Sequence, residues 1–200
     1  MKNKNFFFKI FFIIFSIFYS HSALSDEFMF SANEVESLDG GNLIKGYGGV
    51  EINDSLNLTI SGDQFEFNKI DSLLKVTNNV LVNDKLNKSL IKTNQINYNK
   101  ELNIITSLGK TIIELNSGHI IESLDVIFDK NLNILFSNDK TFITGPNKNK
   151  FSMGTFKFSI TTKILTTKDI EIKDNKGNKH NVKNIKKNLK TNEILGKDLS

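Results

Sequence analysis

Histidine and cysteine are the residue types that most often carry metal or nucleophilic chemistry, and this chain has few of them. His21 lies in the apolar N-terminal segment, which leaves His119 and His180 for the rest of the chain, and there is no cysteine. Neither histidine has another at the spacing of a zinc ligand set. We therefore predict no metal and no cofactor, and interpret both as ordinary surface or turn residues.

Carboxylates are more numerous, but they do not form an obvious catalytic pair. Asp63, Glu66, Asp125 and Asp129 fall on outward positions of a repeat or in its turns. A glycan-cleaving enzyme would need two carboxylates on one exposed face, and the sequence leaves that alternative open. The glycines of GYGG, residues 46–49, lack the lysine and following helix of a phosphate-binding loop. The prediction is a protein that is not an enzyme.

The C-terminal region is basic. Its lysines are Lys173, Lys176, Lys179, Lys183, Lys186, Lys187 and Lys190. We favour a solvated, weakly ordered terminal hairpin here; the alternative is contact with an anionic lipid headgroup or membrane surface.

The first 25 residues have the pattern of a secretory signal peptide. Lys2, Lys4 and Lys9 precede an apolar run that ends near Tyr19, and small residues follow up to Ser25. The run is too short for a typical spanning helix, although an uncleaved anchor remains the alternative. Because the segment holds three lysines and no acid, its removal lowers the formal net charge from +4 to +1. So balanced a chain is not expected to bind nucleic acid.

The remaining chain repeats itself every 30 or 31 residues. The phrase DQFEFNKIDSLLKV returns as NQINYNKELNII and LDVIFDKNLNIL. Two columns of apolar residues carry the period, one at Val35, Phe65, Ile96, Val126 and Phe156, the other at Phe67, Tyr98, Phe128 and Phe158. Such a period indicates one structural unit stacked repeatedly, each burying its apolar face on the next.

Each unit is predicted to be a bent hairpin. Apolar and polar residues alternate on both sides of polar turns at 68–72, 99–103 and 129–133. Gly48-Gly49, Asn78-Asn79, Gly109 and Asn138-Asp139 interrupt the second strands, which indicates bulges that curve the sheet. The predicted fold is an all-β, elongated, partly open antiparallel β-jellyroll or "taco" of about ten strands. Residues 26–200 are expected to form it as one domain.

The repeats resemble the OstA-type periplasmic domain of the lipopolysaccharide transport family. The resemblance rests on ANEVE…GYGGVEI, SGDQFEFNKIDSLLKVTNNVLV and KTNQINYNKELNIITSLGKTII, and covers residues 28–199. The later copies and the closing NEILGKDLS are most similar to the N-terminal periplasmic region of the assembly protein LptD, with stand-alone LptA-like proteins next. The chain has no room for the outer-membrane barrel of LptD.

This resemblance implies a non-catalytic carrier in the periplasm, associated with the outer membrane. Its implied partners are lipopolysaccharide, related Lpt-type β-domains that dock by strand addition, and an outer-membrane barrel with its lipoprotein plug. The implied lipid lining is Val50, Ile52, Phe65, Phe67, Val80, Val82, Ile96, Tyr98, Ile113, Val126, Phe128, Ile143, Phe156, Phe158, Ile170 and Ile172. The implied docking edge is Phe30, Ala32 and Val35. A structural or adhesive β-repeat protein with a closed core is the alternative.

Overall fold

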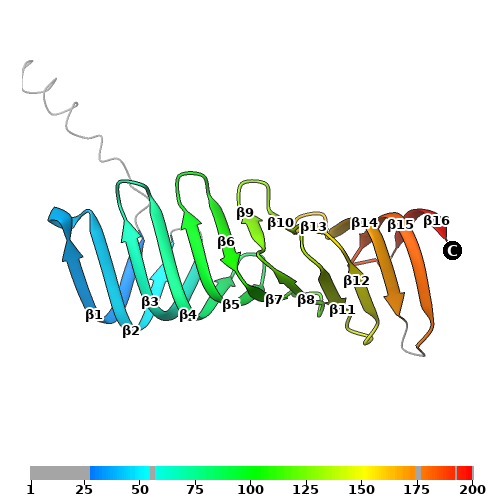
Figure 1. The fold of residues 1–200 in the computed structure, drawn as a ribbon, viewed down its shortest axis with the longest axis horizontal. Helices are drawn as coiled ribbons and strands as arrows, with labels where there is room; N and C mark the ends of the chain where they lie inside the picture. The colour runs from blue at the N-terminus through cyan, green and yellow to red at the C-terminus, as the bar shows by residue number, and fades with distance from the viewer. Residues whose placement is uncertain (1–27, 55–56, 174–176, 192, 200) are drawn as a thin grey trace, which may run out of the picture.

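The computed structural model describes residues 28–54, 57–173, 177–191 and 193–199, so the predicted signal peptide lies outside the described residues. They form one antiparallel sheet (Figure 1). Its strands are β1 (Met29–Leu38), β2 (Leu43–Asn53), β3 (Leu58–Asn68), β4 (Leu73–Asp84), β5 (Ser89–Asn99), β6 (Ile104–Leu108), β7 (Lys110–Glu114), β8 (Ile120–Leu124), β9 (Ile127–Asp129), β10 (Ile134–Ser137), β11 (Thr141–Thr144), β12 (Lys150–Met153), β13 (Phe156–Ser159), β14 (Ile164–Lys173), β15 (Lys179–Asn188) and β16 (Ile194–Leu199). A single 3-10 turn, η1 (Asp39–Gly41), joins β1 to β2 among these residues.

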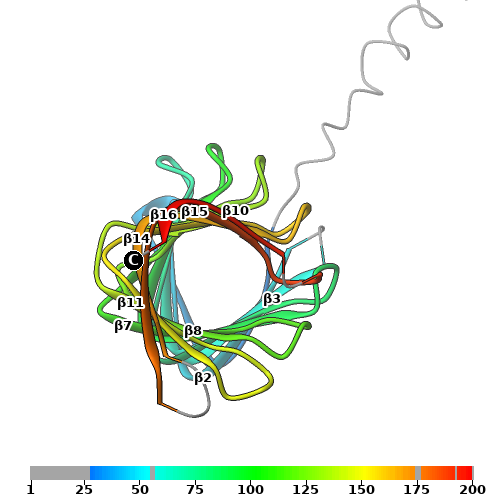
Figure 2. The same ribbon diagram turned by 90° about the vertical axis from the view of Figure 1, so that its right-hand side faces the viewer.

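The sheet divides into two branches in the middle of the molecule. Strands β1 to β5 pair in sequence order, and β5 then pairs with both β6 and β7. One branch continues through β6, β9, β10 and β13, the other through β7, β8, β11 and β12. Both branches end on β14, which also pairs with β15. The strands therefore surround an interior that runs along the long axis (Figure 2).

The bends lie where the sequence predicts them. Gly48, Gly49, Asn78 and Asn79 all have positive φ, and the strand registers shift beside them. Such a shift is a bulge, which bends a strand without breaking it. At Gly109 the bend interrupts the strand and divides it into β6 and β7. The expectation of about ten strands is too low, because the bends in the middle units divide each hairpin arm into two short strands.

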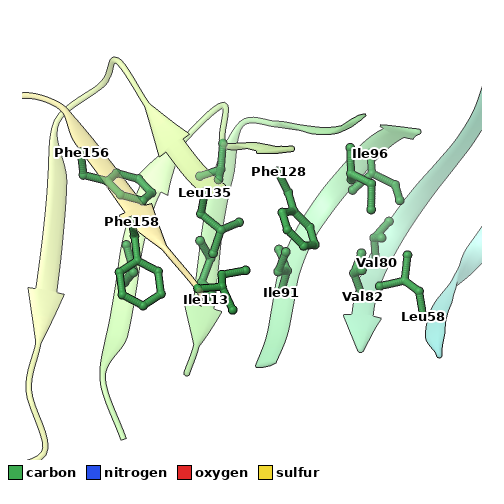
Figure 3. Close-up of a cluster of buried hydrophobic side chains, with 14 of the residues drawn as sticks. Leu58, Val80, Val82, Ile91, Ile96, Ile113, Phe128, Leu135, Phe156 and Phe158 are labelled. Carbon is green, nitrogen blue, oxygen red and sulfur yellow. The ribbon is translucent and has the colours of Figure 1, made fainter. Parts of the chain in front are cut away.

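Inward-facing side chains of both branches fill the interior. The two predicted columns face it in register from Phe65 onward, with Phe65 opposite Val76 and Val76 opposite Ile96. Val35, the first member of its column, is 54% exposed. Figure 3 shows part of the buried cluster, in which Phe128, Leu135 and Phe158 come from one branch and Ile113 from the other. This alternation of buried and exposed residues is what period-two strands produce when one face is apolar. The structure thus confirms the elongated, antiparallel all-β fold.

The basic C-terminal region contains a long paired strand. Strand β15 pairs with β14 over nine residue pairs, from Ile164–Asn188 to Lys173–Lys179. Lys179, Lys183 and Lys186 are exposed, but Lys187 is 5% exposed because it faces inward. Most lysines of the region are thus solvated, as expected, but Lys187 is not, and the inward residues of β15 complete the interior. Lys176 lies outside the described residues.

Candidate functional site

The turns of the hairpins form two rows, one at each end of the strands. The first turn row consists of residues 38–42, 68–72, 99–103, 129–133, 159–163 and 188–191. The second consists, among the described residues, of Asp54 and Asn57 and of residues 84–89, 114–120 and 144–150. The two rows approach each other, because Asp54 of the second row contacts Lys130 of the first and residues of both rows line one hollow. We call the line along which they approach the seam.

One position recurs in each turn of the first row after the β1–β2 turn, with the same backbone hydrogen bond. Its N–H donates to a carbonyl of the preceding turn at 2.8 to 3.0 Å. The residues at this position are Lys69, Lys100, Lys130, Ile160 and Leu189. Three lysines therefore occupy the N-terminal part of the first row, and two buried apolar residues occupy the C-terminal part.

The second row changes character in the same direction. At the corresponding interval it carries Asp54, Asp84, Leu115 and Gly145. Both aspartates are buried, and each stabilises its own turn: Asp54 accepts a hydrogen bond from the Leu58 N–H, and Asp84 from the Asn87 N–H. One of these lysines, Lys130, meets one of these aspartates, Asp54, across the seam.

An ion pair closes the seam between residues 76 positions apart. Lys130 Nζ donates to Asp54 Oδ2 at 2.5 Å and to the Tyr98 hydroxyl at 2.9 Å. The Lys130 and Asp54 side chains are only 12% and 2% exposed. Burial is the largest influence on the pKa of Lys130 and lowers it, but the hydrogen bonds to Asp54 and Tyr98 together raise the pKa above its ordinary value. Lys130 is therefore held as a cation at the mouth of an apolar interior.

Aromatic rings cover the interior beside β1. Lys100 Nζ lies 4.3 Å from the centroid of the Phe28 ring. Phe28 in turn packs edge-on against Phe67 and Tyr98, with ring centroids 5.4 and 5.3 Å apart. A lysine above an aromatic face is attracted by the negative π surface. This end of the interior thus has an aromatic lining and a cationic rim.

A second buried cation lies near the other end. Lys187 Nζ is 5.0 Å from the centroid of the Phe151 ring, and burial lowers its pKa. His119, in the second-row turn between β7 and β8, is 2% exposed, and its Nδ1 lies 2.9 Å from the Ser117 hydroxyl. Burial first, and then the charge of Lys187, lower the pKa of His119. The interpretation of His119 as a turn residue holds, but it is not on the surface.

A hollow of about 250 Å³ opens at the seam between the two rows. Leu58 and Phe128 contribute apolar side chains to it, and Lys130 a charge. The remaining lining is Asn57, Asp84, Leu86, Asn87, Asn103, Asn131 and Asn133. A separate hollow of about 470 Å³ involves β10, β13, β14 and β15, with Phe136 and Lys168 among its lining residues.

All of the predicted lining residues face the interior. Fourteen are buried, and Phe67 and Ile172 are half-buried against the same cluster. They fill the interior with their own side chains, and their contact with lipid stays a prediction. Among the docking-edge residues, Phe30 and Ala32 pack against the cluster, whereas Val35 is 54% exposed on β1, a strand with β2 as its neighbour.

Sequence reasoning missed Asp54 and Lys130. The signal was available in part, because Lys69, Lys100 and Lys130 recur at 31 and 30 residues and Asp54 and Asp84 at 30. The other carboxylates singled out in the sequence have local partners. Glu66 forms an ion pair with Lys45, Asp125 accepts a hydrogen bond from the Gly109 N–H, and Asp129 accepts one from the Leu132 N–H.

Within the described part of the chain, no group of three or more histidines and acidic residues is placed to hold a metal ion. The same residues contain no helix with the length and apolarity needed to cross a membrane. The fold and interior define an elongated antiparallel β-repeat protein with one continuous apolar core.

Comparison with known proteins adds little to this class. No protein-family model and no curated protein matches the chain. One similar solved structure is LptH, the LptA homologous periplasmic component of the lipopolysaccharide transport device of Pseudomonas aeruginosa, with a TM-score of 0.30 and 9% identity over 72% of this chain and 82% of that one. Another is the TCP10 domain of Danio rerio CPAP in complex with a STIL peptide, with a TM-score of 0.16 and 11% identity over 76% and 97% of the two chains. Similarities this low carry no argument about function.

Proposed function

We propose that this protein carries lipopolysaccharide across the periplasm toward the outer membrane, with the acyl chains in the apolar interior. The observation that supports the proposal best is the continuity of that interior. One cluster of buried apolar residues extends from Phe28, before β1, to Leu189, after β15. A lipid inside it could move along the axis and exchange one apolar contact for the next, at nearly constant buried area.

The sheet offers strand edges for transfer between proteins. Residues Phe30, Ala32 and Val35 belong to β1, which has β2 as its one partner strand among the described residues. Its other edge would serve as a template for strand addition by a related β-domain. The chemistry of transfer requires no catalytic group, which agrees with a carrier. Signal-peptide cleavage, a periplasmic location and docking to an outer-membrane barrel belong to the same proposal.

A structural or adhesive β-repeat protein is the second candidate, and the packing of the interior favours it. The residues that would line a lipid path are already buried against one another, with Ile52, Ile96, Ile113 and Ile143 at 0% exposure. A lipid would have to separate the two turn rows and replace these contacts. In a closed structural protein the same contacts are simply the core.

Photocrosslinking separates the two candidates. A photoreactive residue is placed at Phe67, Tyr98 or Phe128 in the full chain, and at Glu66 as an outward control on the strand that carries Phe67. The carrier predicts lipopolysaccharide adducts at the three inward positions and none at Glu66. Folded variants that give no adduct at any inward position would favour the closed structural protein.

A further inference from the structure

The two parts of the seam differ in the polarity of the side chains that line them. In the C-terminal part the recurring turn position carries Ile160 and Leu189, which are buried in the core. In the N-terminal part it carries lysines, and the facing row carries aspartates. The seam is therefore chemically suited to a charged group in its N-terminal part.

Lys130 is the lysine of that part that pairs with an aspartate of the facing row. Its ammonium group is held at the level of the apolar lining by Asp54 and Tyr98, next to the 250 Å³ hollow. The Tyr98 hydroxyl donates a hydrogen bond to Asn103 Oδ1 at 3.2 Å, so its oxygen is left to accept one from Lys130. An anion in the hollow would meet Lys130, and Asn103, Asn131 and Asn133 also line it. The Asp84 carboxylate lines the hollow too, and its two oxygens accept hydrogen bonds from the Asn87 N–H and side-chain amide.

The apolar residues of the hollow indicate that such an anion is part of an amphiphile. Phe128 and Leu58 are buried members of the core cluster and also contribute to the hollow. A group bound to Lys130 would thus have its attached chain directed onto the core. Free inorganic anions would gain nothing from this apolar contact, whereas a lipid would gain for every methylene buried.

We propose that the seam at Lys130, Asp54 and Tyr98 binds the phosphate of an acidic lipid headgroup. The phosphate takes the place of the Asp54 carboxylate as the partner of the Lys130 ammonium group. This inference rests on the proposed lipid carriage and specifies where the lipid enters. Separation of the two rows returns Asp54 to water, and the phosphate compensates the charge of Lys130. Loss of the partner without this compensation would leave a buried charge, which is strongly unfavourable. Lipid A and phospholipids share the required phosphate.

The test compares variants of opposite expected sign in the full chain. Lys130→Met removes the cation, and Asp54→Asn removes the competing charge while the retained Oδ1 still accepts from the Leu58 N–H. Lys75→Met is the matched control, because Lys75 is exposed on the outward face of β4. Equilibrium binding is measured for diphosphorylated lipid A, dephosphorylated lipid A, phosphatidylglycerol and inorganic phosphate.

We expect Lys130→Met to weaken binding of diphosphorylated lipid A by about tenfold or more, since a hydrogen bond to a charged group is lost, with binding of the dephosphorylated form unchanged. We expect Asp54→Asn to strengthen phosphate-dependent binding and Lys75→Met to leave it unchanged. Weaker binding in Asp54→Asn, or no difference between Lys130→Met and Lys75→Met, would show that the pair is only structural. Inorganic phosphate that binds as tightly as lipid would overturn the headgroup assignment.

Two further measurements keep the test decisive. If a single variant does not fold, the double variant Lys130→Met/Asp54→Asn, which has no unpaired charge at this position, replaces it and should lose the preference for phosphate. The ratio of lipid A to phosphatidylglycerol binding identifies the source of the phosphate. Crosslinking from Phe128 reports lipid in the interior: adducts with an unchanged phosphate preference in Lys130→Met overturn the headgroup site alone, whereas no adduct in any folded variant overturns both proposals.

Discussion

Lys187 offers a test of how the interior is closed, because it is a buried cation beside an aromatic ring. No carboxylate lies within ion-pair distance of it among the described residues, and burial lowers its pKa. The substitution Lys187→Met keeps an unbranched side chain and removes the charge. We expect this variant to be more stable than the wild type.

The magnitude follows from three contributions. Loss of the contact with the Phe151 ring costs about 1 kcal/mol, given its 5.0 Å separation. A methionine sulfur near the same ring returns roughly 0.3–1.5 kcal/mol. Relief from burying a charge contributes several kcal/mol at most, in part already offset by relaxation and water. The expected net stabilisation is about 2 kcal/mol, or roughly 4–8 °C in Tm for a chain of this size.

The pH dependence gives the same experiment a second readout. Because the folded pKa of His119 lies below its unfolded value of about 6.5, the unfolded state binds more protons as the pH falls through this window. The contribution of His119 to the free energy of unfolding is therefore fully present above pH about 6.5, and it is lost as the pH falls toward the folded pKa. Lys187→Met removes one cause of the lowered pKa, so its advantage over the wild type should grow from pH 7 to pH 5.

Urea unfolding at several pH values and an NMR titration of His119 measure both effects. Lys186→Met, at the adjacent exposed position of β15, is the control and should change stability by less than about 0.5 kcal/mol. If Lys187→Met is less stable than Lys186→Met, or if the His119 pKa does not rise in it, the inferred cost of the buried charge is refuted.

Two further predictions concern the interior and the bends. Phe128→Ala should lower the free energy of unfolding by about 3–5 kcal/mol, because it leaves a cavity in the buried cluster. Phe142→Ala, on the outward face of β11, should have a small effect. Equal losses of stability in urea unfolding would contradict the assignment of faces. Gly49→Ala should cost about 1–2 kcal/mol because Gly49 has a φ of +86°, although nothing lies within 4 Å of the added Cβ. Gly154→Ala, equally unobstructed and without a positive φ, is its control, and equal thermal stability of the two variants would show that the bend tolerates a side chain.

The fold was predictable because its determinants are local and repeated. Period-two alternation places Phe65, Ile96 and Phe128 on one face, and the breaker residues Gly49 and Asn79 sit where the backbone turns to positive φ. Each unit contacts mainly its neighbours, so a pattern of about 30 residues is enough to specify it. The strand count was underestimated because the sequence does not show whether a bend also breaks the pairing.

The contacts across the seam depend on the whole domain. Asp54 meets Lys130 only after several units of strand twist accumulate and bring a turn of one row opposite a turn of the other. Likewise, Lys187 reads as one more lysine in a basic segment, yet it is buried near His119 because β15 completes the interior. The sequence by itself determined the repeat, the bent hairpins and the inward residues. Only the tertiary structure decided which charges meet, because twist adds over many residues and no local pattern encodes its sum.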